Sequence, residues 1–178
     1  MKRVYDQIIA MGPPKELSVA DLLQEMETNQ IEFKSTARKP LDPNIPEKVI
    51  NEGIIKTVAA FMNAKGGTLG IGISDDGDLL GIQPDLDFKK QDIDGYENWL
   101  STMLMGAVGQ SNVASLVKIR FEANDGKDIC LVDVKPASKP VYAKTAKGND
   151  TFFVRIGNSS RVLTGPEMVD YIAQRHTN

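Results

Sequence analysis

The side chains best suited to catalysis or metal binding are those of Glu27, Glu32 and Lys34. Alternation around Phe33 predicts a strand over 31–35, on which Glu32 and Lys34 point to one face and Phe33 points into the core. A carboxylate beside an ammonium suits phosphodiester cleavage, because the carboxylate binds a divalent metal and the lysine faces the charge that builds on the phosphate. The same pair also fits a surface salt bridge beside a buried phenylalanine, since Glu-x-Lys is common by chance in strands.

A second acidic element, Asp75-Asp76, follows the apolar stretch 68–73, which is short enough to be a central strand. If the first strand lies beside this one, Glu32 and Asp75 can converge, with Glu27 arriving from the preceding turn. Three carboxylates in one site repel each other without a cation, so this set predicts a metal site. Carboxylate oxygens select Mg²⁺ or Mn²⁺. The alternative for Asp75-Asp76 is ordinary hairpin-turn chemistry.

The elements that would position these residues are predicted from apolar periodicity and turn signals. Helices are expected from Ser18, over 47–63, over 88–105 and from about 165; strands are expected near 31–35, 68–73, 116–122, 129–135 and 151–156, and a polar loop over 157–161. Asn63 and the Gly66-Gly67 pair stop the helix over 47–63, because glycine adopts the left-handed conformation without a Cβ clash. The expected fold is a single α+β domain over 17–178, a mixed β-sheet flanked by helices, after an N-terminal arm over 1–16.

Length and composition exclude several classes of protein. The 178 residues suffice for one domain with a full core, and no apolar run approaches the roughly 20 residues of a membrane span. The N-terminus lacks the continuous apolar core of a signal peptide, so a cytoplasmic location without membrane partners is expected. One cysteine, Cys130, and one histidine provide neither an internal disulfide nor a Cys/His zinc site.

Charge is unevenly distributed along the chain. The net charge is −3, which argues against a generally basic nucleic-acid binder, yet the segment 135–161 holds six basic residues and one acid. Its phosphate-contacting candidates are Lys144, Lys147, Arg155 and Arg161. The alternative is a solvated basic face, and Arg155 fits equally well as a partner for a carboxylate inside the fold.

Four motifs together resemble the Schlafen-type AlbA domain over roughly 17–175. They are Glu27-x4-Glu32-Phe33-Lys34, the helix end 58–67, the stretch 69–77, and the strand and loop 153–161. The resemblance implies an α/β domain that binds DNA in bacteria. It also implies a relation to vertebrate Schlafen proteins, in which two such units cleave structured RNA, tRNA especially, with Mg²⁺ or Mn²⁺. By position the family's catalytic carboxylates correspond to Glu27, Glu32 and Asp75, and its lysine to Lys34.

The predicted function is therefore a nucleic-acid-binding Schlafen-like domain that acts as a metal-dependent endoribonuclease on structured RNA such as tRNA. A homodimer is expected, because the family's RNA-clamping unit pairs two domains and this chain has one; the arm over 1–16 is a candidate contact. The alternative is a non-catalytic DNA- or RNA-binding or interaction module of a transcriptional regulator. ATP binding has little support, since the chain lacks a Gly-x4-Gly-Lys-Ser/Thr loop.

Overall fold

The computed structural model describes residues 16–176, which form an α+β domain. In chain order its elements are α2 (Val19–Glu25), β1 (Ile31–Lys34), α3 (Glu47–Met62), β2 (Gly67–Ile71), α4 (Gln83–Lys89), α5 (Ile93–Val108), α6 (Gln110–Leu116), β3 (Val117–Asn124), β4 (Lys127–Val134), β5 (Ala143–Lys144), β6 (Asp150–Thr151), β7 (Phe153–Ile156), β8 (Ser159–Val162) and α7 (Gly165–His176). The predicted fold class is confirmed. The predicted arm over 1–16 lies almost wholly outside the described residues.

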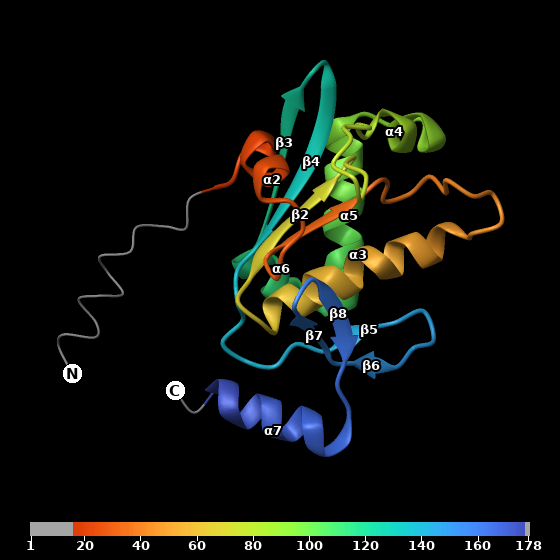
Figure 1. Cartoon of the computed structure of the whole chain (residues 1–178). Helices are drawn as coiled ribbons and strands as arrows, with labels where there is room; N and C mark the ends of the chain where they lie inside the picture. The colour runs from red at the N-terminus through yellow and green to blue at the C-terminus, as the bar shows by residue number, and fades with distance from the viewer. Residues whose placement is uncertain (1–15, 177–178) are drawn as a thin grey trace.

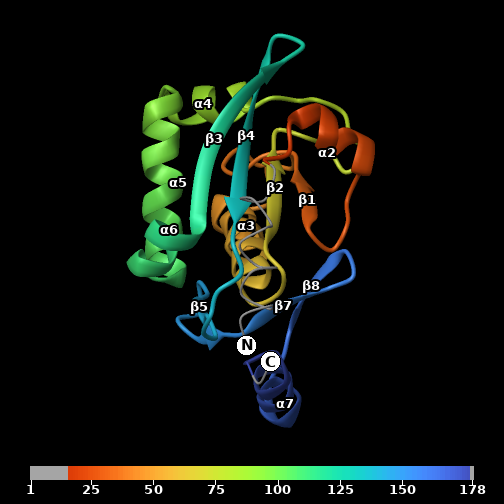
Figure 2. The ribbon, with the colours of Figure 1, turned by 90° about the vertical axis from the view of Figure 1, so that its left-hand side faces the viewer.

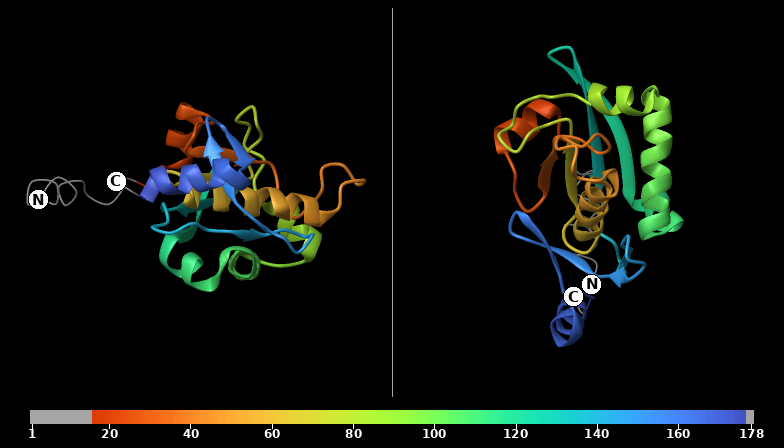
Figure 3. Two further views of the ribbon diagram at one scale, coloured as in Figure 1. Left: turned by 90° about the horizontal axis from the view of Figure 1, so that it is seen from below. Right: turned by 90° about the vertical axis from the view of Figure 1, so that its right-hand side faces the viewer.

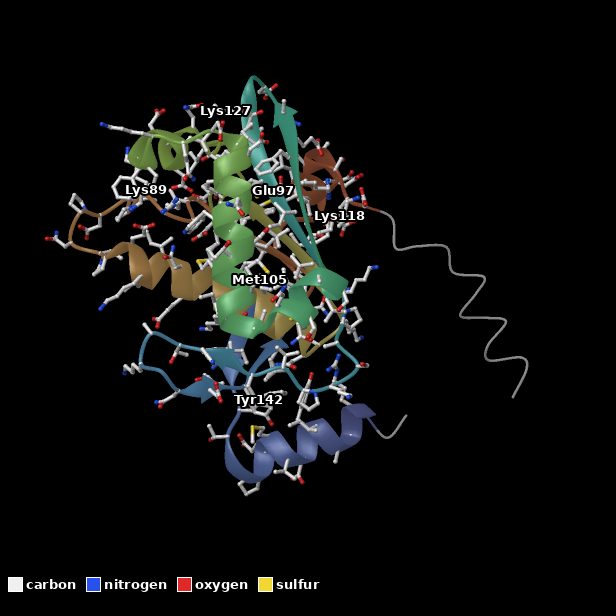
Figure 4. The ribbon with its side chains drawn as sticks, turned by 180° about the vertical axis from the view of Figure 1, so that it is seen from behind. Lys89, Glu97, Met105, Lys118, Lys127 and Tyr142 are labelled. Carbon is white, nitrogen blue, oxygen red and sulfur yellow. The ribbon has the colours of Figure 1, made fainter. Side chains whose placement is uncertain are left out.

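A four-stranded mixed sheet organises the domain, in the order β1-β2-β4-β3 (Figures 1 and 2). β1 runs parallel to β2, and the other neighbours are antiparallel. α3 and α5 cover one face of the sheet and α2 covers the other. Seen from behind, α5 lies in front of the sheet and carries Glu97 and Met105 (Figure 4). The strand with Glu32 and Lys34 is therefore an edge strand beside β2, the neighbour that a convergence of Glu32 and Asp75 requires.

Alternation along the strands divides the core between the two faces. Leu69, Ile71 and Cys130 pack with α3 and α5, whereas Phe33 and Leu131 pack on the side of α2. Burial raises the pKa of the Cys130 thiol well above its usual range, because a thiolate would lose its hydration. Cys130 is thus a buried apolar residue in practice.

The turn between α3 and β2 is held by buried contacts. α3 ends at Met62, and the side chain of Asn63 is fully buried. Its Nδ2 donates to the carbonyls of Val141 and Phe153, both at 2.8 Å, and its Oδ1 accepts from the N–H of Val141 at 2.9 Å. Gly66 has φ +75°, and a Cβ there would lie 2.5 Å from the carbonyl oxygen of Val134. The helix stop predicted at Asn63 and Gly66-Gly67 is confirmed.

The long helix predicted over 88–105 is two helices. α4 ends where Lys90 adopts a left-handed conformation, and α5 begins after Asp92, whose side chain accepts from the N–H of Gly95 at 2.9 Å. This cap moves the start of the long helix to Ile93. α5 ends at Val108, where Gly109 has φ +96°, and a separate short helix, α6, follows over Gln110–Leu116.

At two predicted turns the structure also differs from the sequence-based prediction. After Asp75-Asp76, the expected second strand is reduced to a single bridge between Ile73 and Leu79. The polar loop predicted over 157–161 contains β8, which pairs with β7 as a short hairpin. Pairing of β7 with β8 satisfies backbone N–H and C=O groups of both strands. The polar side chains of this segment do not indicate that pairing in the sequence. This hairpin carries Arg155 and Arg161 to the edge of the sheet.

The C-terminal helix α7 packs at the end of α3 and lies nearest the viewer in the view from below (Figure 3, left). The hydroxyl of Tyr171 donates to the carbonyl of Asn63 at 2.7 Å, and Arg175 donates to the carbonyls of Met62 and Ala64. These bonds satisfy orphan carbonyls at the end of α3. Among residues 16–176, no helix has the length and apolarity to cross a bilayer.

Candidate nucleic-acid interface

Glu32 lies between two cations at the edge of the sheet. Its Oε1 is 2.5 Å from Nζ of Lys34, and its Oε2 is 2.7 Å from Nη2 of Arg155, without the alignment of a hydrogen bond. The side chain of Glu32 is 13% exposed and that of Arg155 is 1% exposed. Phe33, the residue between Glu32 and Lys34 in sequence, is fully buried. The salt-bridge interpretation of the Glu-x-Lys motif thus describes this arrangement.

Arg155 is an internal residue. Besides its contact with Glu32, it donates from Nη2 to the carbonyls of Thr28 at 2.8 Å and Ile31 at 3.2 Å, and its guanidinium lies 5.3 Å from the ring centre of Phe61. These contacts join β7 to the turn before β1. The alternative that Arg155 pairs with a carboxylate inside the fold is what the structure shows.

The structure does not gather the three predicted metal ligands. Oε1 of Glu27 accepts from the N–H of Phe33 at 2.9 Å, both oxygens of Glu32 face cations, and Asp75 is exposed in its turn. No group of three or more acidic, histidine or cysteine residues within 16–176 is arranged to hold a metal ion. A divalent cation at Glu32 would meet two positive charges already in place. These residues therefore do not fit Mg²⁺ or Mn²⁺ in this arrangement.

A basic cavity of about 420 Å³ opens beside this edge, between β1, α3 and the β7–β8 hairpin. Its charged lining residues are Glu32, Lys34, Lys56 and Arg161, and its uncharged ones are Gly53, Thr57, Asn158, Ser159 and Ser160. Lys56 and Arg161 are exposed, and no hydrogen bond or ion pair engages either side chain among the described residues. The cavity therefore has a positive excess and several hydroxyl and amide donors, a combination suited to phosphate.

Sequence reasoning missed Lys56 and Gly53. They lie one helical turn apart on α3, on the polar side of the apolar stripe that defines this helix, and that spacing is the signal that could have identified them. A Cβ at Gly53 would meet no atom within 4 Å, so the helix surface there is open toward the cavity.

The other predicted basic residues, Lys144 and Lys147, do not line the cavity. Both are exposed, in β5 and in the turn that follows it. That turn is held near the first half of α3, because the N–H of Ala146 donates to Oε1 of Glu52 at 2.7 Å. Of the four predicted phosphate contacts, Arg161 alone lines this cavity.

Comparison with known proteins places the chain in a family. A family model described as Schlafen, AlbA_2 matches residues 27–164. A similar solved structure is the DIP2311 protein from Corynebacterium diphtheriae, with 19% identity and a TM-score of 0.53; the match covers 91% of this chain and 29% of that protein. Another is the N-terminal domain of a Nitrosomonas europaea protein named as RecG-related ATP-dependent DNA helicase, with 25% identity and a TM-score of 0.45, covering 84% of this chain and 95% of that domain. No curated protein matches significantly.

Proposed function

Because this chain belongs to the Schlafen AlbA_2 family, we propose that it binds nucleic acid through the cavity lined by Lys34, Lys56 and Arg161. Family membership favours nucleic acid as the ligand. The observation that carries the choice of site is the pair of uncompensated cations, Lys56 from α3 and Arg161 from β8, in one cavity. The match to DIP2311 spans 29% of that protein, so it supports the fold alone.

The lining residues suit the sugar–phosphate backbone. Arg161 has the planar donor fork that binds two phosphate oxygens at once, and Lys56 supplies a compact point charge. Ser159 and Ser160 add hydroxyl donors from the same hairpin. Such contacts position a strand without reading its bases, so we expect weak sequence preference.

The cavity is tested by replacing both Lys56 and Arg161 with glutamate. We expect binding of duplex DNA and structured RNA to fall by at least tenfold, and the slope of log K against log salt to become shallower by roughly two, about 0.9 for each lost contact on duplex DNA. Fluorescence anisotropy over a series of salt concentrations measures both quantities.

The matched control replaces Lys144 and Lys147 with glutamate, which makes the same change in net charge on exposed residues outside the cavity. We expect a smaller loss of affinity from this pair. An equal or larger loss would move the interface to the β5–β6 turn, and binding without any salt dependence would exclude a phosphate interface altogether.

A second candidate is an endoribonuclease acting on structured RNA such as tRNA. The observation in its favour is that Glu32 and Lys34 line the same cavity as Lys56 and Arg161. Since the set Glu27, Glu32 and Asp75 does not fit a metal ion in this arrangement, we assign no metal-dependent step to it. The homodimer predicted from the family's paired unit also stays a prediction, which light scattering at micromolar concentration tests.

The two candidates differ in what happens to tRNA. An endoribonuclease centred on Glu32 predicts tRNA cleavage that disappears in the Glu32→Gln variant, whereas a binding module leaves tRNA intact throughout. Gel electrophoresis of labelled tRNA, with parallel reactions in Mn²⁺ and in EDTA, measures the cleavage and shows whether a divalent metal takes part. Cleavage that survives Glu32→Gln would rule out a nuclease centred on Glu32, because that carboxylate would then be dispensable.

A further inference from the structure

A second cavity, of about 450 Å³, lies between the C-terminal end of α3 and α7. Its basic lining residues are Lys65, Arg155 and Arg175, and its other polar ones are Asn29, Tyr171 and Gln174. Within the described part of the chain, no acidic residue lines it. It shares no lining residue with the cavity beside Glu32, so it is a separate site on the same side of the domain as the β7–β8 hairpin.

Two arginines that line this cavity each carry an N–H group without an acceptor among residues 16–176. Nη2 of Arg175 donates to the carbonyls of Met62 at 3.1 Å, Ala64 at 2.9 Å and Ala137 at 2.9 Å, whereas its Nη1 is buried with no acceptor among the described residues. Nε of Arg155 is likewise buried and without an acceptor in residues 16–176. Buried donors without acceptors are rare and costly, and a bound anion would supply the acceptors that both groups lack.

The charges around the cavity set the kind of anion it fits. Arg155 lies 2.7 Å from Glu32, a carboxylate that it shares with Lys34. Lys65 is exposed, and neither Lys65 nor Arg175 has a carboxylate partner within residues 16–176, which leaves two positive charges. Burial raises the pKa of the Tyr171 phenol, so this residue adds no negative charge near neutral pH. A phosphomonoester carries about −1.5 to −2 at pH 7, whereas a diester carries about −1.

We propose that this second cavity binds a phosphomonoester, supplied by the terminal phosphate of a nucleic-acid strand. The strand as the source of the phosphate rests on the proposed function; the phosphate site itself stands on the lining residues. The unused N–H groups of Arg155 and Arg175 donate to phosphate oxygens, and Lys65 closes the open side with its ammonium. Asn29 and Gln174 offer amide donors at the rim. Because the internal phosphates of a strand are diesters, a site for a phosphomonoester distinguishes the phosphorylated end of the strand from its internal phosphates.

The test compares oligonucleotides of one sequence that end in 5′-phosphate, in 3′-phosphate or in hydroxyl groups at both ends. We expect one phosphorylated end to bind the wild-type chain on the order of tenfold more tightly, the factor that one charge-assisted hydrogen bond supplies. Lys65→Glu should remove this advantage without changing the fold, because no hydrogen bond or ion pair of its side chain is found in the described residues. Lys48→Glu is the matched control, an exposed lysine in α3 that does not line the cavity.

Inorganic phosphate and a nucleoside 5′-monophosphate, titrated by NMR or calorimetry, separate the two sources of phosphate. Binding of these small molecules that is lost in Lys65→Glu, without preference for a phosphorylated strand end, supports the phosphomonoester site and assigns it to free nucleotides. If all oligonucleotide binding is absent while phosphate still binds, the proposed function fails and this site stands. Equal binding of every strand end, together with no response to either small molecule, overturns the proposal.

Discussion

Replacing Arg155 with methionine is expected to lower the free energy of unfolding by about 3–5 kcal/mol, the typical cost of removing one partner of a buried ion pair. Its Nη2 is 2.7 Å from Oε2 of Glu32, and the Arg155 side chain is 1% exposed. The change also leaves the carbonyls of Thr28 and Ile31 without this donor. Urea denaturation followed by circular dichroism measures the loss, provided that the m-value is unchanged.

Two further variants test whether the buried ion pair is the cause of the stability lost in Arg155→Met. Glu32→Gln in the Arg155→Met background should recover part of the stability, because the remaining buried group is then uncharged. Arg161→Met, on the paired strand β8, removes an exposed arginine instead and should change stability by less than about 0.5 kcal/mol. If Arg155→Met destabilised the fold no more than Arg161→Met does, the buried pair would not be what joins β7 to β1.

The parts of the fold that follow from local sequence were predictable. The apolar stripe of α3 and its end before Asn63 both depend on residues close together in the chain. The capping residue Ser18 and the side chain of Asp21 likewise begin α2 as expected. In these places propensity, periodicity and turn chemistry agree, and the structure follows them.

The candidate site depends on contacts between distant segments, and these were only partly predictable. β1 lies beside β2, as the convergence of Glu32 and Asp75 required. Arg155, the second partner of Glu32, lies in the strand predicted over 151–156, and only β8, which pairs with that strand, falls in the predicted loop. Asp75 follows the central strand as expected but stays exposed, because its turn closes on itself through hydrogen bonds of Ser74. The residues that set the net charge around Glu32 thus lie outside the sequence motif that predicted the site.

Removal of the Asp85 carboxylate is expected to destabilise the connection between β1 and α3. Asp85 is 1% exposed and accepts from the N–H groups of Ala37 at 2.8 Å, Arg38 at 3.2 Å and Lys39 at 2.7 Å, and from the hydroxyl of Tyr96 at 3.3 Å. Asp85→Ala leaves these donors unpaired, at about 1–3 kcal/mol for each one that stays buried, so a total loss of about 3 kcal/mol or more is expected. Thermal and urea unfolding measure it.

The effect of Asp85→Ala should also be local. The connection begins directly after Lys34, so amide hydrogen exchange at Ala37 and Arg38 should accelerate more than exchange in β4, which the carboxylate does not touch. Asp87→Ala is the matched control, since Asp87 is exposed and its carboxylate accepts only from the side chain of Gln83 among the hydrogen bonds found in the described residues. Equal losses from the two variants would mean that the buried carboxylate does not organise this connection.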